Sequence, residues 1–244
     1  EVGGGFDGER ESRRPLFVWA HLYDPHHPHI VHAGYEEIST TYDAEIAYMN
    51  DPIDRLYQHV SNTAPDTIWI LIADHGEAFE GQHGESSHGL FLYEETMAIP
   101  WIIQPYPALS ETQIVNTPSS VVDVPNTVLG LLELPPLENI DGINAIAEDR
   151  TQPVYMESNT VQQRFGYHPE IALSNGKDKL MPTANPHLYD LNADPNETQN
   201  LYTEATAPEW SDWAGLGRSL YMDSPRFTMD SPDASVMKQL EALG

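Results

Sequence analysis

The stretch Ile68-Trp-Ile-Leu-Ile-Ala-Asp-His-Gly-Glu77 gives the strongest indication of the architecture of this chain. Its first five residues are apolar and mostly β-branched or aromatic, a pattern typical of a buried strand. The run then breaks into Asp74, His75, Gly76 and Glu77. In open α/β sheets, ligands bind beyond the carboxyl ends of the strands. The stretch therefore predicts a buried strand whose end carries a ligand-binding rim.

Strand-like and helical patterns alternate along the first part of the chain. Strands are predicted over residues 15–23, 67–73 and 98–104, and helices over 36–60 and 119–134. Pro52 inside the first helical pattern indicates a kink or two abutting helices. Strands separated by helices of this length predict an α/β fold with a mostly parallel sheet.

The pattern changes after Pro135. Strands are predicted over 153–158 and 170–181, the second bent into a hairpin at Asn175-Gly176, and a short helix from about Ser235. We therefore expect a small antiparallel subdomain packed on the main sheet. The predicted organisation is a loop or disordered start over 1–14, the α/β domain over 15–140, and the antiparallel subdomain with its C-terminal helix over 141–244.

The composition limits the classes of partner. The 244 residues include 38 acidic and 11 basic side chains, for a net charge of -27, and no cysteine. Nucleic acid is excluded as a partner because phosphate contacts need Lys and Arg, and no apolar run is long enough to span a membrane. Such an acidic surface indicates a halophilic source, and we expect the cytoplasm of a high-salt organism. An anionic substrate would need local positive charge, which a bound metal ion could supply.

Asp74 and His75 are the first candidates for binding such an ion. A carboxylate followed directly by an imidazole at a strand end can offer two ligands to one cation, and Gly76 allows the backbone to turn without a side chain in the way. An equally strong alternative has Asp74 capping a helical turn and His75 on the surface. Oxygen ligands favour Ca²⁺ or Mg²⁺, whereas a histidine ligand moves the preference toward Mn²⁺ or Zn²⁺.

Two histidine-rich loops follow the predicted strands. The second contains His83 and His88; we expect a functional role for His88, while a structural role for His83 is as well supported as a direct one. In the first, His21 lies in the predicted strand, where it has either a functional role or a structural role in the core, and we expect no role for His27 and His32. The first loop reads His21-Leu-Tyr-Asp-Pro-His-His-Pro-His29, and its prolines stiffen it.

Five blocks in order resemble the C-terminal half of the sulfatase family, within the alkaline-phosphatase-like superfamily. They are "HLYDPHHPH" from His21, "YDAEIAYMNDPIDRLYQHV" from Tyr42, "IWILIADHGEAFEGQHGESSHGLFLYEETMAIPWII" from Ile68, "VVDVPNTVLGLLEL" from Val121 and "HLYDLNADPNETQNL" from His187. Five ordered blocks are far more specific than one. The resemblance implies part of an alkaline-phosphatase-like α/β/α sandwich followed by a small antiparallel subdomain.

The resemblance also implies a chemistry. Sulfatases hydrolyse sulfate esters with a formylglycine made from Cys or Ser, beside one divalent metal ion. By their match to the family's motifs, Asp74 and His75 resemble metal ligands, and His21 and His88 resemble histidines that contact the sulfate or assist the leaving group. The implied metal is Ca²⁺ first, with Mg²⁺, Mn²⁺ and Zn²⁺ as alternatives. The implied substrate is a small-molecule or carbohydrate sulfate ester.

The chain departs from the family pattern in two respects. The family's Cys/Ser-x-Pro-x-Arg nucleophile motif and its N-terminal aspartate ligands have no counterpart here. We therefore expect a C-terminal fragment that lacks the formylglycine, is inactive alone and is completed by a missing N-terminal half. The alternatives are a phosphoesterase, phosphonate-ester hydrolase or phosphoryl-group transferase of the same superfamily, and a non-catalytic sulfatase-like binding module.

Overall fold

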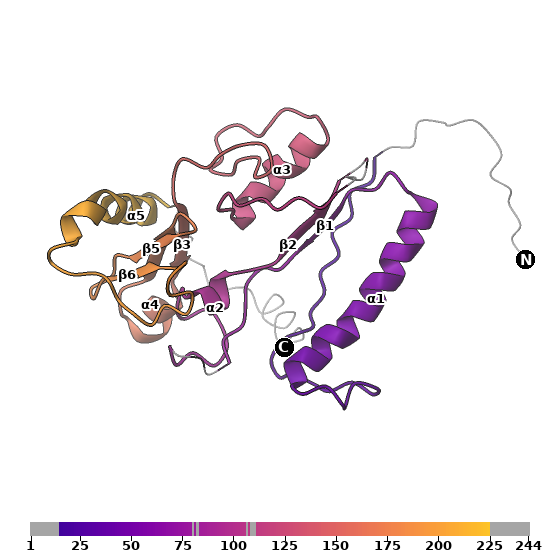
Figure 1. The fold of residues 1–244 in the computed structure, drawn as a ribbon, viewed down its shortest axis with the longest axis horizontal. Coiled ribbons are helices and arrows are strands. Elements are labelled where there is room, and N and C mark those ends of the chain that lie inside the picture. Colours follow the sequence, from indigo (N-terminus) through magenta and orange to yellow (C-terminus); the bar gives the residue numbers. More distant parts are fainter. Residues whose placement is uncertain (1–14, 80, 82, 106, 108–110, 225–244) are drawn as a thin grey trace, which may run out of the picture. The chain divides into compact units, whose positions relative to one another are not determined.

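The computed structural model describes residues 15–79, 81, 83–105, 107 and 111–224 (Figure 1). The chain divides into two compact units, Glu1–Pro65 and Asp66–Gly244. The domain boundary expected after residue 140 stays a prediction. The predicted start over 1–14 and the predicted helix from Ser235 lie outside the described residues.

The first unit is built around one long helix, α1 (Thr41–Thr63). The Thr40 side chain begins it by accepting a hydrogen bond from the backbone N–H of Asp43 at 3.0 Å. The helix predicted over 36–60 is confirmed, and it continues through Pro52 as a single helix of 23 residues. Pro52 therefore lies inside one helix and does not divide it into two.

The strand predicted over 15–23 is wrong. This segment has no regular secondary structure, and Leu16, Phe17, Val18 and Trp19 are 69–86% exposed. A strand needs a neighbour that pairs with its N–H and C=O groups, and no strand among the described residues pairs with this segment. The apolar pattern therefore indicates side chains that favour burial, although they are exposed in this structure.

The second unit begins with a two-stranded sheet. Strands β1 (Trp69–Ile72) and β2 (Trp101–Gln104) confirm two of the predicted strands. They pair antiparallel, with Trp69 opposite Gln104, so the expected parallel pairing is wrong for these strands. The chain between them turns back through the short helix α2 (Glu94–Met97) instead of crossing over the sheet. The mixed α/β class itself is confirmed.

The helix predicted over 119–134 is confirmed as a 3₁₀ turn, η1 (Val121–Asp123), followed by α3 (Val124–Leu131). A capping box begins it: Ser120 and Asp123 exchange side-chain and backbone hydrogen bonds. Asp123 is fully buried and also pairs with the guanidinium of Arg150. This carboxylate thus ties the helix start to the chain that follows α3.

The second part of this unit is an antiparallel sheet, as predicted, but it has four strands and the last of them, β6, was not predicted. Its order is β3-β4-β5-β6, and α4 (Thr160–Phe165) joins the first two strands. The hairpin at Asn175-Gly176 is confirmed, with Gly176 at φ +84°. The strands are Val154–Ser158, Glu170–Ser174, Asp178–Met181 and His187–Asp190.

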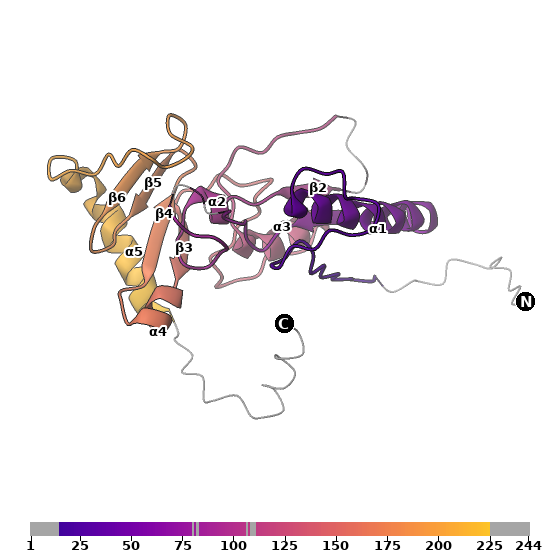
Figure 2. The ribbon, with the colours of Figure 1, turned by 90° about the horizontal axis from the view of Figure 1, so that it is seen from below.

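The two faces of this sheet bury different partners. Ile171 and Leu173 face α5 (Ser211–Asp223), whose Tyr221 completes that cluster; Figure 2 shows α5 along the sheet. On the other face, Ala172, Met181 and Tyr189 pack against Leu92 in the chain before α2. This alternation follows from the two-residue repeat of a strand. Neither α5 nor the turn before it, η2 (Ala207–Trp210), was predicted.

An ion cluster is buried on the face that meets α2. Lys179 of β5 is fully buried; its Nζ donates to Oε1 of Glu94 at 2.9 Å and lies 3.0 Å from Oε1 of Glu197. The second contact is an ion pair between two buried side chains. Burial raises the pKa of Glu197, and the charge of Lys179 opposes that rise. The cluster joins α2, the sheet and the loop that contains Glu197.

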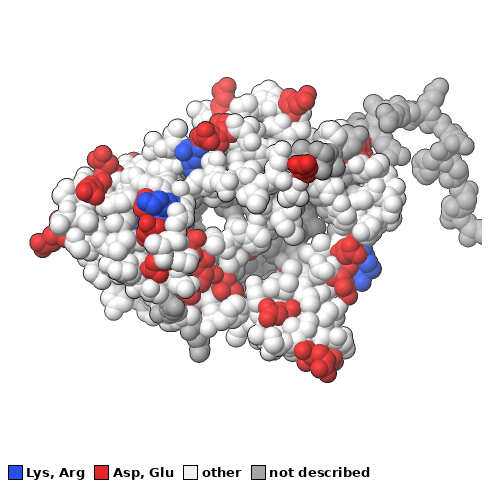
Figure 3. Space-filling view, in the orientation of Figure 1, with Lys and Arg blue, Asp and Glu red and all other residues white. Residues whose placement is uncertain are grey.

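Acidic side chains are scattered over the visible surface, with few basic ones between them (Figure 3). This distribution agrees with the net charge of -27. Within the described ranges, no helix has both the length and the apolar character needed to cross a membrane.

Candidate functional site

The polar rim follows β1 as the sequence predicts. Asp74 is exposed just beyond the end of the strand, and His75, Gly76 and Glu77 come directly after it. Gly76 N–H donates to the carbonyl of Thr96 at 2.8 Å. A Cβ atom at Gly76 would lie 2.5 Å from the carbonyl oxygen of Glu95. Glycine is therefore needed because the α2 backbone passes so close, and its φ is not in the left-handed region.

Asp74 and His75 present a donor pair that fits a metal ion. Nδ1 of His75 lies 2.7 Å from the carbonyl oxygen of Gly76. A carbonyl only accepts, so this contact favours the tautomer with its proton on Nδ1, and in that neutral ring Nε2 keeps its lone pair. Nε2 lies 3.8 Å from Oδ2 of Asp74, whereas two ligands of one ion lie up to about 4 Å apart. A backbone carbonyl on the second ring nitrogen is the usual support of a metal-bound histidine.

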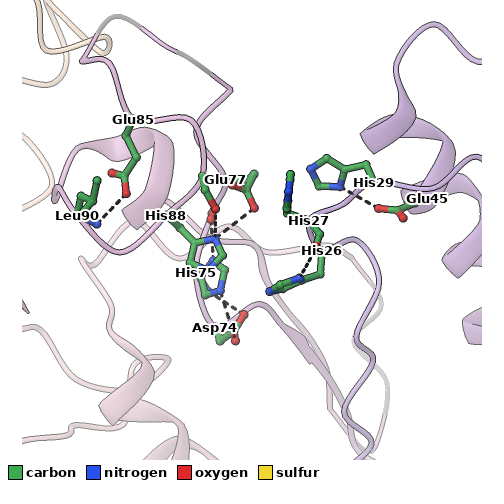
Figure 4. A network of polar contacts seen from close by, with 12 residues as sticks. His26, His27, His29, Glu45, Asp74, His75, Glu77, Glu85, His88 and Leu90 are labelled. Atoms are coloured by element: carbon green, nitrogen blue, oxygen red, sulfur yellow. Dashed lines mark hydrogen bonds and ion pairs between the residues drawn. The ribbon is translucent and has the colours of Figure 1, made fainter. Parts of the chain in front are cut away.

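His88 lies against this pair from the following loop (Figure 4). Its ring stacks on the ring of His75 with centroids 3.9 Å apart. Its Nδ1 is 3.3 Å from Oε2 of Glu77, whose side chain is only 7% exposed. The carboxylate of Glu77 therefore orients the His88 ring, and a protonated imidazole in this place can donate to an anionic oxygen.

The loop that carries His88 is held by a buried carboxylate that the sequence reasoning missed. Glu85 is 2% exposed and accepts hydrogen bonds from the N–H groups of Leu90 at 2.7 Å and Phe91 at 3.0 Å. Gly84 and Gly89, at φ +77° and +89°, make the turns on either side. The signal available in the sequence was an acidic residue five positions before the apolar run that starts at Leu90.

His83 has the structural role that the sequence left open. Its Nε2 lies 3.1 Å from the carbonyl oxygen of Asn196. Its ring is stacked on Tyr93 with centroids 3.4 Å apart. These contacts attach the loop to the turn before Glu197 and leave no indication of a direct chemical role.

His21 and the first histidine loop belong to the other unit. His21 is exposed and lies in the segment that does not form a strand, so its proposed role stays a prediction. In the same loop, Nδ1 of His29 lies 2.9 Å from Oε2 of the buried Glu45. The structure brings together Asp74, His75 and His88; the place of His21 relative to them is not defined.

A hollow of about 350 Å³ lies beside the four-stranded sheet and was not predicted. Aromatic rings line it together with one carboxylate and two imidazoles. Burial shifts the pKa of the carboxylate and of one imidazole. Burial lowers the pKa of His187 and raises that of Glu170. The uncharged form of each is therefore favoured in the folded protein. The lining includes Phe91, Tyr93, Tyr167, His168, Glu170 and His187.

His187 gives a test of this environment. The unfolded chain takes up a proton at His187 near pH 6.5, whereas the folded protein does so only at lower pH. Between these values the folded state binds fewer protons, so stability decreases as the pH falls below 6.5. The melting temperature is expected to fall between pH 7 and pH 5.5, and His187→Gln should make this fall smaller. The control is His59→Gln, at an exposed position of α1, which should show the same fall as the unsubstituted chain. An equal loss in both variants would contradict the assignment.

Comparison with known proteins places the site in a family. The family model described as Sulfatase matches residues 6–134. A relative from Escherichia coli K12, described as an uncharacterized sulfatase, YidJ, is 28% identical over 161 residues, which cover 63% of this chain and 32% of that protein. The chain thus spans about a third of the length of that relative.

Two solved structures share the fold. One is BT4656 in complex with its substrate D-glucosamine-2-N,6-O-disulfate, with a TM-score of 0.58, 21% identity, and coverage of 80% of this chain and 42% of that one. The other is a phosphonate monoester hydrolase from Silicibacter pomeroyi, with a TM-score of 0.61, 21% identity, and coverage of 75% and 41%. Both agree with a partial alkaline-phosphatase-like fold.

Proposed function

This chain belongs to the sulfatase family, and we propose from this that it supplies half of the metal site and one sulfate-binding histidine of a sulfate-ester hydrolase. The observation that carries the proposal is the donor pair of Asp74 and His75, in which Nδ1 of His75 contacts a backbone carbonyl and Nε2 faces Asp74. His88, oriented by Glu77, is the proposed donor to the sulfate or to the leaving-group oxygen. His21 is the second candidate for that role.

The chemistry divides between the metal ion and this chain. When bound, a divalent cation such as Ca²⁺ would polarise the ester and stabilise developing negative charge. Asp74 and His75 would hold it and offset its charge. His88 would donate a proton or a hydrogen bond to an oxygen of the ester, and Glu77 would keep its ring in place. These steps suit a small-molecule or carbohydrate sulfate ester.

The nucleophile is proposed to come from another polypeptide segment. The sequence contains no cysteine and no Ser-x-Pro-x-Arg motif. The exposed apolar residues from Leu16 to Trp19 are the kind of surface that a further strand or helix would cover. Both observations support a hydrolase that is completed by residues outside this chain.

The substrate class can be tested on the completed protein. The chain would be produced together with a polypeptide carrying the Cys/Ser-x-Pro-x-Arg motif and the aspartate ligands, for example one encoded directly upstream of Glu1, and with the formylglycine modification. We expect kcat/KM to be higher for an aryl sulfate than for a phosphonate monoester or a phosphate diester, in Ca²⁺, Mg²⁺, Mn²⁺ or Zn²⁺. A preference for the phosphonate monoester would favour the second candidate, which the likeness in fold to the Silicibacter pomeroyi hydrolase supports.

A further inference from the structure

We propose a second cation site, in the first unit, formed by Asp24, His32 and Glu45. One ligand atom from each of these side chains lies within 4.8 Å of the others. Ligands bound to one ion at about 2.0 to 2.4 Å are at most about 4 to 4.8 Å apart. The three atoms can therefore bind a single ion after small side-chain movements. The site uses neither Asp74 nor His75.

His32 supplies the strongest indication of a missing partner. Its Nε2 is buried and has no hydrogen-bond partner, which is rare for a buried polar atom. Its ring is fixed by stacking on Tyr48, with centroids 3.6 Å apart and planes 12° from parallel. A cation beside Nε2 would satisfy this atom. The sequence reasoning expected no role for His32, and this geometry gives it one.

Glu45 is prepared as a ligand by its own neighbours. It is 1% exposed; Nδ1 of His29 lies 2.9 Å from its Oε2, and Ile30 N–H donates to its Oε1 at 2.6 Å. Figure 4 shows the contact with His29. Outer contacts of this kind orient the carboxylates that bind metals. Each oxygen has a second lone pair, so these hydrogen bonds leave it able to bind an ion.

Helix α1 places two parts of the site on one face. Glu45 and Tyr48 are three residues apart, a spacing that puts side chains on the same side of a helix. The first provides a ligand and the second holds the ring of His32. Asp24 and His32 come from the loop before the helix. A bound ion would therefore tie that loop to α1, and we assign it a structural role.

The donor set indicates the class of ion. Two carboxylates and one imidazole differ from the all-oxygen sites that suit Ca²⁺ and Mg²⁺. Mixed nitrogen and oxygen ligands suit Zn²⁺ and Mn²⁺, with water in the remaining positions. Zn²⁺ is the better probe because nitrogen and oxygen sites bind it more tightly than Mn²⁺. Its charge would balance the two carboxylates.

The experiment is a titration of the complete, metal-free chain with Zn²⁺, measured by calorimetry and by the melting temperature. We expect one site of highest affinity, whose occupation raises the melting temperature. His32→Phe keeps a ring on Tyr48 but removes Nε2, and it should weaken this site by about 100-fold or more, since even outer contacts of metal sites change affinity 10- to 100-fold. Titration with Co²⁺ should give a visible absorption band that His32→Phe loses.

Controls separate this site from the other histidines. Glu45→Gln keeps an oxygen for the contacts with His29 and Ile30, and it should also lose the high-affinity site. His27→Gln, at an exposed position of the same loop, should bind as the unsubstituted chain does. His75→Gln should also retain the high-affinity Zn²⁺ site. The test of this second site is therefore independent of the test of the proposed sulfatase site, which contains His75. Equal Zn²⁺ affinity in His32→Phe and the unsubstituted chain would overturn the proposal, as would loss of the site in His75→Gln alone.

Discussion

Replacing Lys179 with Met should lower the free energy of unfolding by about 3–5 kcal/mol, the usual result of removing one partner from a buried ion pair. Lys179 is fully buried, and Glu197 is 2% exposed beside it. Without the ammonium group, the carboxylate of Glu197 keeps the cost of burial and loses the charge that offsets it. Urea unfolding at constant high salt measures the change.

A matched control lies two residues away on the same hairpin. The Lys177 side chain is 58% exposed, with Asp178 and Asp190 at 3.7 and 3.9 Å. Exposed pairs of this kind contribute about 0–1 kcal/mol, so Lys177→Met should change stability little. The double variant Lys179→Met with Glu197→Gln should recover part of the loss, because no buried charge is then left alone. Equal effects at the two lysines would show that the buried cluster is not a stabilising feature.

Replacing Asp74 with Asn in the completed hydrolase should reduce kcat/KM about 10²- to 10³-fold. The metal is expected to stabilise the transition state by several kcal/mol, and each 1.4 kcal/mol corresponds to a factor of ten. Asn keeps the shape of the side chain but removes the charge that would hold the cation. The measurement is the rate of aryl-sulfate hydrolysis across a range of metal concentrations.

His83→Gln is the control for this variant. His83 lies in the same histidine-rich loop, yet it is held by Asn196 and Tyr93. We expect its loss to leave kcat/KM close to the unsubstituted value. Excess metal should restore part of the activity of Asp74→Asn if its defect is in metal binding. A fall in activity at His83 as large as at Asp74 would contradict the assignment of ligands.

Local patterns were enough to predict much of the fold. The apolar run before Asp74 is a strand, the repeat from Tyr42 is a helix, and Asn175-Gly176 is a hairpin turn. Each of these three elements is determined mainly by residues that are close together in the sequence. The run from Leu16 to Trp19 has the same local character, yet it lies exposed. Strand formation also depends on a partner, which periodicity alone cannot reveal.

The features that were missed depend on contacts distant in sequence. Helix α5 contains Gly215 and Gly217, which weaken a helical signal, but Gly217 packs against Leu173 where a Cβ would lie 2.7 Å from its Cδ1. In the sequence Glu85 is one of several acidic residues in a loop, and its role depends on its contacts with the N–H groups of Leu90 and Phe91. His32 and Glu45 meet only because the loop folds onto α1.

The most direct test of the proposed function is the release of inorganic sulfate from an aryl sulfate by this chain, alone and with the segment that carries the nucleophile. Both samples would contain divalent metal at high salt. We predict no release above background by the chain alone, and release by the completed protein that Asp74→Asn abolishes or strongly reduces. Robust release by the chain alone would show that the nucleophile lies within it and would contradict the proposal.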